Sequence, residues 1–193
     1  MNMKSSLTTT ISSGRFKGKK LFLPSLNTTR STKSIVKESF FSAARQDIVG
    51  KVFIEVFGGS ALMAAEALSN YAAKAYAVEL DRDSYKFTKK NIDNLNDQNI
   101  LAINADTFKI TPQIVNENDD IVLYIDPPFD IRDGFGGIYE RVWDMISALD
   151  KSKIFLIVLE HISTYNSPDS CAGFSKFKSR KFGKTTLSYY KQH

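Results

Sequence analysis

From Lys51 onward the chain alternates short apolar runs with segments of helical periodicity, and this alternation constrains its fold most strongly. The apolar runs have the length of buried strands and lie at Val52–Phe57, Lys74–Glu79, Ile100–Asn104, Ile121–Ile125 and Ile154–Glu160. Continuous apolar runs are typical of parallel strands that are covered on both faces. Helices are expected between them at Ser60–Tyr71, Arg82–Leu95 and Gly137–Leu149. The pattern predicts an α/β fold with a doubly wound, mostly parallel sheet.

The two ends of the chain follow a different pattern. Phe174–Phe182 and Thr185–Lys191 flank Gly183-Lys184, which predicts an antiparallel hairpin at one edge of the sheet. Ile11–Leu23 predicts a second, smaller hairpin, and the apolar spacing after residue 32 predicts a helix. We therefore expect residues 1–50 to form a basic appendage and residues 51–193 to form the main domain.

Composition excludes several classes of protein. The 193 residues include one cysteine and two histidines, so neither a disulfide framework nor a zinc cluster is expected. The longest strongly apolar run, Ile154–Leu159, is far shorter than the roughly 18 residues that a membrane helix needs. The first residues are mostly polar, so we expect no secretory signal, no membrane association and a cytoplasmic location.

The net charge of +5 is unevenly distributed. Basic residues dominate positions 1–50 and 174–193, whereas acidic residues dominate the stretch between them. Such a distribution is expected for a protein that holds a polyanion with its two ends. Lysine-rich segments that only maintain solubility would look the same, and charge alone does not separate these two interpretations.

Ligands of open α/β sheets bind at the carboxyl ends of the strands, so these ends are the candidate site. Gly58 and Gly59 follow the first strand and allow a sharp turn close to a ligand, with Ser60 as the expected cap of the next helix. The full G-x-G-x-x-G fingerprint is absent, which disfavours a nicotinamide cofactor. Gly183-Lys184-Thr185 lacks the first glycine of a phosphate loop, which excludes that ATP-binding motif.

Two acidic residues follow at the next strand ends. Glu79 lies about 20 positions beyond the glycine turn, where a carboxylate can accept hydrogen bonds from ribose hydroxyls. Asp106 follows the third strand and could contact an adenine amino group. An ordinary exposed carboxylate at residue 79 and a helix cap at residue 106 are the alternatives.

The fourth strand ends in Asp126-Pro127-Pro128-Phe129, the most specific motif of the chain. The two prolines stiffen the backbone and lack N–H donors. Asp126 and the Pro127 carbonyl can therefore form a pair of acceptors for an amino group, while Phe129 offers a flat face for a base. A proline-bounded loop with a buried phenylalanine is the structural alternative.

This motif resembles the signature of S-adenosylmethionine-dependent methyltransferases that modify amino groups of bases. More closely, the chain resembles the RsmD-type family of 16S rRNA (guanine-N2)-methyltransferases. The resemblance extends over Ser13–Gly18, Arg30–Phe41, Phe57–Ser60 with Glu66–Ser69, Val78-Glu79 and Phe182–Thr185. It departs at Glu55, where the family has Asp, and at Ala61, where it has a second glycine; the other departures are Ser31 for Pro, Lys37 for Arg and Ser42 for Asn.

The resemblance implies a Rossmann-like class I methyltransferase sheet and S-adenosylmethionine as the cofactor. The implied reaction is methyl transfer to a guanine 2-amino group of 16S rRNA, at the guanine(966) site, by a monomer acting on the small ribosomal subunit or an assembly intermediate. The expected catalytic residues are Asp126, Pro127 and Phe129. The expected cofactor contacts are Glu55, Phe57, Gly58, Gly59, Ser60, Glu79, Leu80, Asp106 and Thr107.

The basic ends are then expected to contact RNA phosphates, which position a substrate without reading its sequence. The expected contacts are Arg15, Lys17, Lys19, Lys20, Arg30, Lys176, Lys178, Arg180 and Lys181. Residues 130–137 would form a lid over the base or an ordinary surface loop. A DNA adenine or cytosine amino-methyltransferase and a catalytically silent RNA-binding protein of the same fold are the alternative functions. The short chain leaves little room for a separate DNA target-recognition domain.

Overall fold

The computed structural model describes residues 7–23, 30–128 and 137–192. Within these ranges the elements follow in the order β1 (Thr8–Thr10), β2 (Lys20–Phe22), α1 (Arg30–Ile48), β3 (Val52–Glu55), α2 (Leu62–Ser69), β4 (Lys74–Glu79), α3 (Arg82–Leu95), β5 (Ile100–Asn104), α4 (Thr107–Asn116), β6 (Ile121–Ile125), α5 (Ile138–Ala148), a 3-10 turn (Lys151–Lys153), β7 (Ile154–Ile162), β8 (Ser170–Cys171), β9 (Phe174–Phe182) and β10 (Thr185–Gln192).

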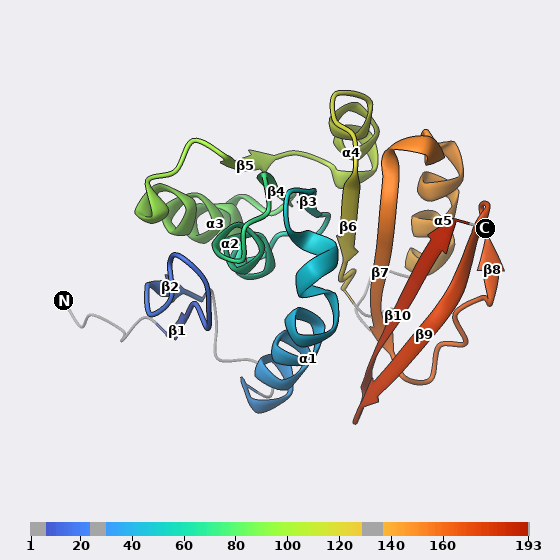
Figure 1. The fold of residues 1–193 in the computed structure, drawn as a ribbon, viewed down its shortest axis with the longest axis horizontal. Helices are drawn as coiled ribbons and strands as arrows, with labels where there is room; N and C mark the ends of the chain where they lie inside the picture. The colour runs from blue at the N-terminus through green and yellow to red at the C-terminus, as the bar shows by residue number, and fades with distance from the viewer. Residues whose placement is uncertain (1–6, 24–29, 129–136, 193) are drawn as a thin grey trace.

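Eight strands form one sheet in the order β5-β4-β3-β6-β7-β10-β9-β8 (Figure 1). Strands β3 to β7 are parallel, whereas β10 pairs antiparallel with both β7 and β9. The predicted α/β fold and its C-terminal hairpin are therefore confirmed. The chain moves outward from β3 through β4 to β5 and then returns to β6 beside β3. This reversal places a topological switch point between β3 and β6, where ligands of such sheets bind.

Helices cover both faces of the sheet. One hydrophobic cluster joins α1, α2 and α3 to one face through residues such as Phe40, Leu68 and Ile92. A second cluster joins α4 and α5 to the other face through Ile114 and Val142, among others. Helix α4 was not predicted, because Pro112 and the polar residues around it interrupt the apolar periodicity of this segment. None of the helices in the described ranges combines the length and apolarity needed to cross a membrane.

The N-terminal segment packs against the main domain. The predicted hairpin is present, but its paired strands are the short β1 and β2, and residues 11–19 form the loop between them. Ile11 and Leu21 are buried in the same cluster as α1 and α2. The Lys37 ammonium of α1 lies 2.5 Å from a buried Glu66 oxygen of α2, and that oxygen also accepts a hydrogen bond from the Ser12 N–H at 2.8 Å. This buried ion pair joins the hairpin, α1 and α2.

Gly14 allows the hairpin loop to lie against α2. Its φ is +80°, and a Cβ there would lie 1.9 Å from the Ser69 carbonyl oxygen. The neighbouring Arg15 N–H donates to that same carbonyl at 2.9 Å. The predicted boundary between an appendage of residues 1–50 and a domain of residues 51–193 stays a prediction. In the described residues, both parts contribute side chains to one hydrophobic core.

Candidate active site

The loop after β3 makes a sharp turn beneath β4. The Gly58 N–H donates to the Val78 carbonyl at 2.5 Å, and a Cβ on Gly58 would lie 2.9 Å from that oxygen. Any side chain at this position would push the turn away from β4. A Cβ on Gly59, by contrast, would meet nothing within 4 Å, so the outer side of the turn is open. Phe57 and Ser60, the other predicted contacts of this turn, are each partly exposed.

Glu55, the last residue of β3, caps helix α2. Its carboxylate accepts hydrogen bonds from the N–H groups of Met63 at 3.3 Å and Ala64 at 2.9 Å. The pKa of Glu55 is raised to about 8, chiefly by burial and to a smaller extent by the nearby Asp126 charge, while the two N–H groups oppose this shift. The predicted capping role of Ser60 is wrong, because the N-cap residue is Ala61, which has φ +59° and no side-chain cap.

Ala61 has a φ of +59°, a left-handed conformation that favours glycine. Its methyl group is fully buried in the core cluster with α2. The departure from the family pattern at this position therefore adds a buried methyl group rather than bulk on the exposed surface of the turn.

Glu79, at the end of β4, holds the glycine turn from the other side. One carboxylate oxygen accepts a hydrogen bond from the Gly59 N–H at 2.8 Å, and the other accepts from the Asp81 N–H at 2.7 Å. Burial raises the pKa of Glu79, and these two backbone donors oppose the shift. Each oxygen retains a lone pair for a further donor. The adjacent Leu80 is 66% exposed, which leaves an apolar surface beside the carboxylate.

Asp106 and Thr107 begin helix α4 at the end of β5. Asp106 is the N-cap residue and accepts a hydrogen bond from the Phe108 N–H at 3.0 Å. The buried Thr107 hydroxyl donates to the Val56 carbonyl at 2.5 Å and so ties α4 to the loop after β3. Asp106 thus acts as a helix cap, as the alternative interpretation predicted. A ligand of Asp106 would have to contact its second carboxylate oxygen.

Asp126 and Pro127 follow directly after β6, at the switch point. Strand β6 lies between β3 and β7, with Tyr124 opposite Glu55 on one side and Val158 on the other. Pro127 is buried and Asp126 is partly exposed. The carboxyl ends of β3, β4 and β6 therefore bring Glu55, Glu79 and Asp126 to one edge of the sheet. Phe129 and most of the predicted lid, residues 129–136, lie outside the described residues.

The sequence reasoning missed Glu160 and its partner Tyr124 at this edge. Glu160 lies near the end of β7, beside Asp126, and accepts a short hydrogen bond from the buried Tyr124 hydroxyl. Burial raises the pKa of Glu160 to about 8, and the Asp126 charge adds to the shift. A detectable signal existed, since Glu160 ends an apolar run just as Glu79 does.

The predicted RNA contacts divide into residues with and without structural partners. Arg15 pairs with Asp97 at 2.9 Å, Lys19 donates to the Leu95 carbonyl at 3.3 Å, Lys176 pairs with Asp169 at 2.9 Å, and Arg180 donates to the Ser39 hydroxyl at 3.3 Å. Lys178 lies over the Tyr189 ring. Among the described residues, Lys17, Lys20 and Lys181 are exposed and make no ion pair or hydrogen bond through their side chains. The Arg30 side chain lies outside the described part of the chain.

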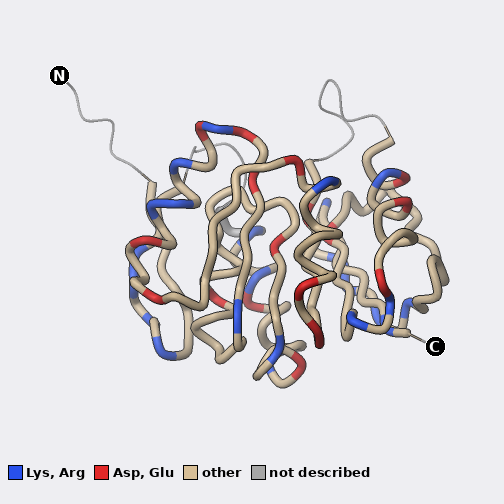
Figure 2. The backbone as a smooth tube through the Cα atoms, turned by 90° about the horizontal axis from the view of Figure 1, so that it is seen from above, with Lys and Arg blue, Asp and Glu red and all other residues tan. Residues whose placement is uncertain are grey.

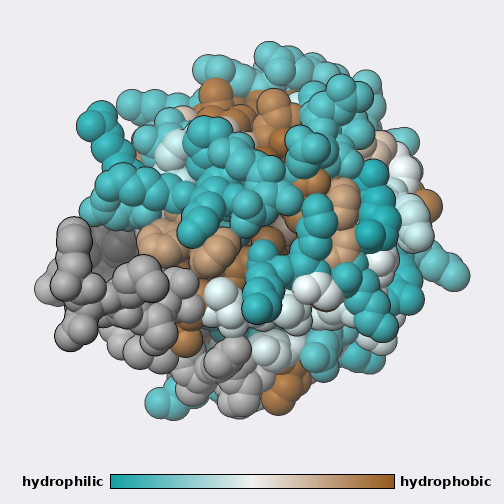
Figure 3. Space-filling model, turned by 90° about the vertical axis from the view of Figure 1, so that its left-hand side faces the viewer, coloured by the Kyte–Doolittle hydropathy of each residue, from teal (hydrophilic) through white to brown (hydrophobic). Residues whose placement is uncertain are grey.

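The two basic ends lie apart in the molecule (Figure 1). The N-terminal hairpin lies beside α2 and α3, whereas the β9–β10 hairpin lies across the molecule, with α1 between them (Figure 1). Basic and acidic positions are interspersed along the backbone (Figure 2). The face that includes the N-terminal hairpin is mostly hydrophilic (Figure 3).

Comparisons with known proteins agree with this architecture. The chain is 31% identical over 119 residues to "Ribosomal RNA small subunit methyltransferase D" of Buchnera aphidicola, covering 62% of each chain. It is 31% identical over 116 residues to the protein of that name from Escherichia coli K12, covering 60% of this chain and 58% of that one. The matched region thus spans about three fifths of these curated relatives.

Solved structures share the fold at lower identity. The structure of yhhF from Escherichia coli superposes with a TM-score of 0.76 at 24% identity and covers 97% of this chain and 99% of that one. The M. jannaschii tRNA m1G37 methyltransferase gives a TM-score of 0.62 at 12% identity, covering 100% of this chain and 59% of that one. The sequence model of the family described as "Conserved hypothetical protein 95" matches residues 9–191, and the chain therefore belongs to this family, the RsmD-type family that its motifs resemble.

Proposed function

We propose that this protein transfers a methyl group from S-adenosylmethionine to the exocyclic 2-amino group of one guanine in 16S rRNA. One observation carries the proposal: Asp126-Pro127 follows β6 at the switch point, beside the glycine turn that Glu79 holds. An acceptor pair for an amino group thus lies next to a loop suited to a nucleoside cofactor. The names of the curated relatives support RNA of the small ribosomal subunit as the substrate class.

The residues of the turn fit S-adenosylmethionine. Gly58 lets the backbone lie close to β4, the outer side of Gly59 is open, and both Glu79 oxygens retain acceptor capacity for ribose hydroxyls. Leu80 offers an apolar surface for the adenine ring, and Asp106 offers a carboxylate oxygen for its amino group. Glu55, Phe57, Ser60 and Thr107 complete the proposed cofactor contacts. When bound, the cofactor supplies an electrophilic methyl group.

The chain's own residues orient and polarise the base. The 2-amino nitrogen of guanine is a weak nucleophile, because its lone pair is delocalised into the ring. The Asp126 carboxylate and the Pro127 carbonyl would accept hydrogen bonds from its two protons and so favour the tetrahedral nitrogen. Phe129 would hold the plane of the base. As the nitrogen becomes positively charged, the Asp126 carboxylate stabilises it and can accept the proton that is released.

The base must leave its stack to reach such a site, which favours a guanine in a loop of the RNA. Exposed lysines on both hairpins, and Arg30, would position the RNA through its phosphates. Because these contacts are electrostatic, we expect binding to weaken as the salt concentration rises. The proposed partner is the small ribosomal subunit or an assembly intermediate, bound by a monomer.

A methyl-transfer assay with labelled S-adenosylmethionine tests the proposal on 16S rRNA, small subunits that lack the modification, and duplex DNA. We expect label in guanine of the RNA substrates alone, and its loss by about 100-fold or more in Asp126→Asn with cofactor affinity retained. Asp144→Asn, a change of an exposed carboxylate on α5, is the matched control. Label in DNA would indicate the DNA amino-methyltransferase, and RNA binding without transfer would indicate a silent RNA-binding protein.

A further inference from the structure

Glu160 lies beside Asp126 at the carboxyl end of the central strands. The register between β6 and β7 pairs Tyr124 with Val158 and Ile125 with Leu159. Asp126 and Glu160 are one residue beyond the last of these pairs, on adjacent strands. Since side chains alternate along a strand, Tyr124, Asp126 and Glu160 face the same side of the sheet, the side that α1 covers.

The Glu160 carboxyl group is held firmly in place. Tyr124, whose hydroxyl donates to it, is 2% exposed, and Glu160 itself is 6% exposed. The Tyr124 ring contacts Phe40 of α1 edge to face at a centroid distance of 5.0 Å and stacks on Phe53 of β3 at 6.2 Å. The hydroxyl group therefore has little freedom to move, and it fixes the carboxyl group that it contacts.

The groups that face Glu160 come from every element packed around it. They are Tyr124 and Asp126 on β6, Tyr189 on β10 and Lys33 at the start of α1. Burial and the Asp126 charge raise the pKa of Glu160, and the Tyr124 hydrogen bond and Lys33 oppose this only in part. Burial and the Asp126 charge thus favour the protonated form of Glu160, as expected for one member of two adjacent carboxyl groups.

We propose that Glu160, held by Tyr124 and adjacent to Asp126 on the neighbouring strand, is a positioning residue for the Asp126 carboxylate. The role rests on the proposed methyl transfer, in which Asp126 contacts the amino group. A neutral neighbour adds no second negative charge, so Asp126 stays in place and remains the acceptor for the reacting nitrogen. Glu160 itself does not touch the substrate in this account.

The kinetic test compares Glu160→Gln, Glu160→Ala and Tyr124→Phe with the unaltered protein in single-turnover transfer to 16S rRNA from pH 6 to pH 9. Gln keeps an acceptor for Tyr124 and stays neutral, so we expect it to lower the rate at pH 7 by less than about threefold and to abolish the change in rate near pH 8. Glu160→Ala should lower the maximal rate about tenfold or more, with KM unchanged, because Asp126 loses its support. Tyr124→Phe should lower the rate less than Glu160→Ala does.

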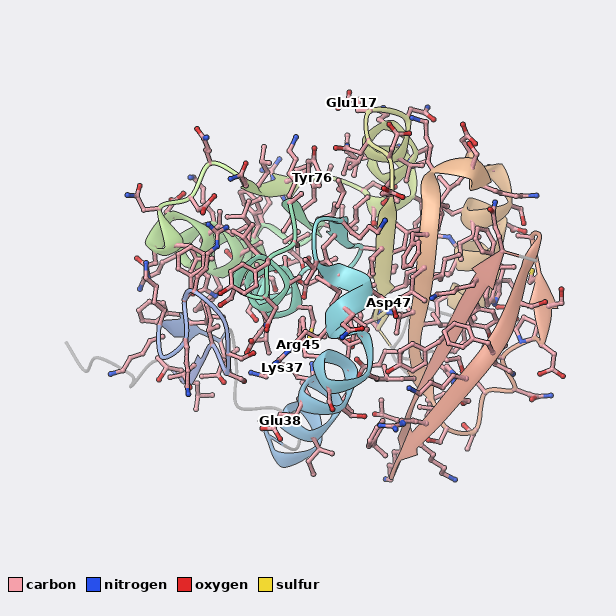
Figure 4. All side chains as sticks on the ribbon, in the orientation of Figure 1. Lys37, Glu38, Arg45, Asp47, Tyr76 and Glu117 are labelled. Atoms are coloured by element: carbon pink, nitrogen blue, oxygen red, sulfur yellow. The ribbon has the colours of Figure 1, made fainter. Side chains whose placement is uncertain are left out.

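Tyr76→Phe is the matched control for Tyr124→Phe. Tyr76 is also a buried strand tyrosine, but its hydroxyl contacts Asn118 at 3.3 Å, and Figure 4 shows it far from the carboxyl end of β6. This variant should leave the pH profile unaltered. Identical pH profiles for Glu160→Gln and the unaltered protein would overturn the proposal, as would a Glu160→Ala variant that raises KM while keeping the maximal rate.

A second readout needs no activity. In the full-length protein labelled with ¹³C at Asp and Glu carboxyl groups, NMR titration should show Glu160 protonated at pH 7, and Glu160→Gln should shift the titration of Asp126. If the unaltered protein methylates no RNA, the proposed function fails and this titration still decides whether the pair exists. A Glu160 that titrates near pH 4.5, independently of Asp126, would refute the pairing.

Discussion

The Glu79 carboxylate accepts a hydrogen bond from the Gly59 N–H at 2.8 Å and thereby joins the end of β4 to the turn after β3. Its other oxygen accepts from the Asp81 N–H at 2.7 Å, at the start of α3. One side chain thus fixes the glycine turn and the next loop relative to each other. The proposed cofactor site is preformed, because these bonds are made by the protein alone.

Replacing Glu79 by Gln should weaken cofactor binding. The amide keeps one acceptor but turns an N–H₂ group towards a backbone N–H, so a charge-assisted hydrogen bond is lost. Such bonds contribute about 1.5–3 kcal/mol, and losing all of that in cofactor binding would raise the Kd for S-adenosylmethionine by about 10- to 160-fold. Calorimetry measures this Kd. Asp83→Asn, which alters an exposed carboxylate paired with Lys86 on α3, is the control, and equal Kd values for the two variants would contradict the proposed role.

Gly14→Ala should destabilise the protein far more than Gly18→Ala. The φ angle is +80° at Gly14 and +85° at Gly18, so an alanine at either position carries about 1–2 kcal/mol of backbone strain. Only at Gly14 does the new Cβ meet a backbone oxygen, and the resulting displacement should add about 1–3 kcal/mol. Urea unfolding of both variants measures the difference. Equal losses would show that the N-terminal loop does not pack on α2 as described.

Stability should fall as the pH rises from about 4.5 to about 8. Glu55 and Glu160 have an ordinary pKa of 4.5 and a native pKa raised to about 8 by burial. Within this window the native protein retains protons that the unfolded chain has released. The stabilisation is thus fully present below pH 4.5 and lost as the pH passes 8, at up to about 1.4 kcal/mol per pH unit for each group.

Glu160→Gln removes one of these groups and should make the decline less steep. Urea unfolding at pH 5.5 and pH 7.5 measures the slope for both proteins. Equal slopes for the variant and the unaltered protein would mean that Glu160 does not hold its proton in the native state.

Replacing Lys17 and Lys20 by Gln should weaken RNA binding without lowering the Tm. Neither side chain has an ion pair or hydrogen bond in the described structure, so both charges are available to phosphates. Two lost contacts with single-stranded RNA should reduce the slope of log K against log salt by about 1.4. Lys86→Gln with Lys89→Gln removes two charges that are paired with Asp83 and Asp93 on α3 and serves as the control. If both double variants bind RNA equally well, the N-terminal hairpin is not an RNA contact.

The sequence predicted the sheet better than it predicted the contacts around the site. Continuous apolar runs mark the central strands β3, β4, β6 and β7 because these strands are largely buried, and Gly183 marks the turn of the C-terminal hairpin. The cap of α2 was assigned to Ser60, whereas Glu55 fulfils that role from another element. Long-range hydrogen bonds of this kind leave no local periodicity and become visible only when the strands are assembled.

The charge pattern was similarly incomplete. The linear excess of Lys and Arg at both ends does not show that Arg15 pairs with Asp97 or Lys176 with Asp169. These acidic partners are provided by the loop after α3 and by the loop before β8. Glu160 was overlooked for a related reason, since its neighbour Asp126 is distant in sequence and adjacent only through the pairing of β6 with β7.

The most direct test of the proposed function is mass mapping of 16S rRNA after incubation of the purified protein with S-adenosylmethionine and RNA from a strain that lacks this gene product. The account predicts one new N2-methylguanine at a single position, absent when Asp126→Asn replaces the unaltered protein. Methylation of any other base or atom, or none in any RNA substrate while the cofactor binds, would contradict it.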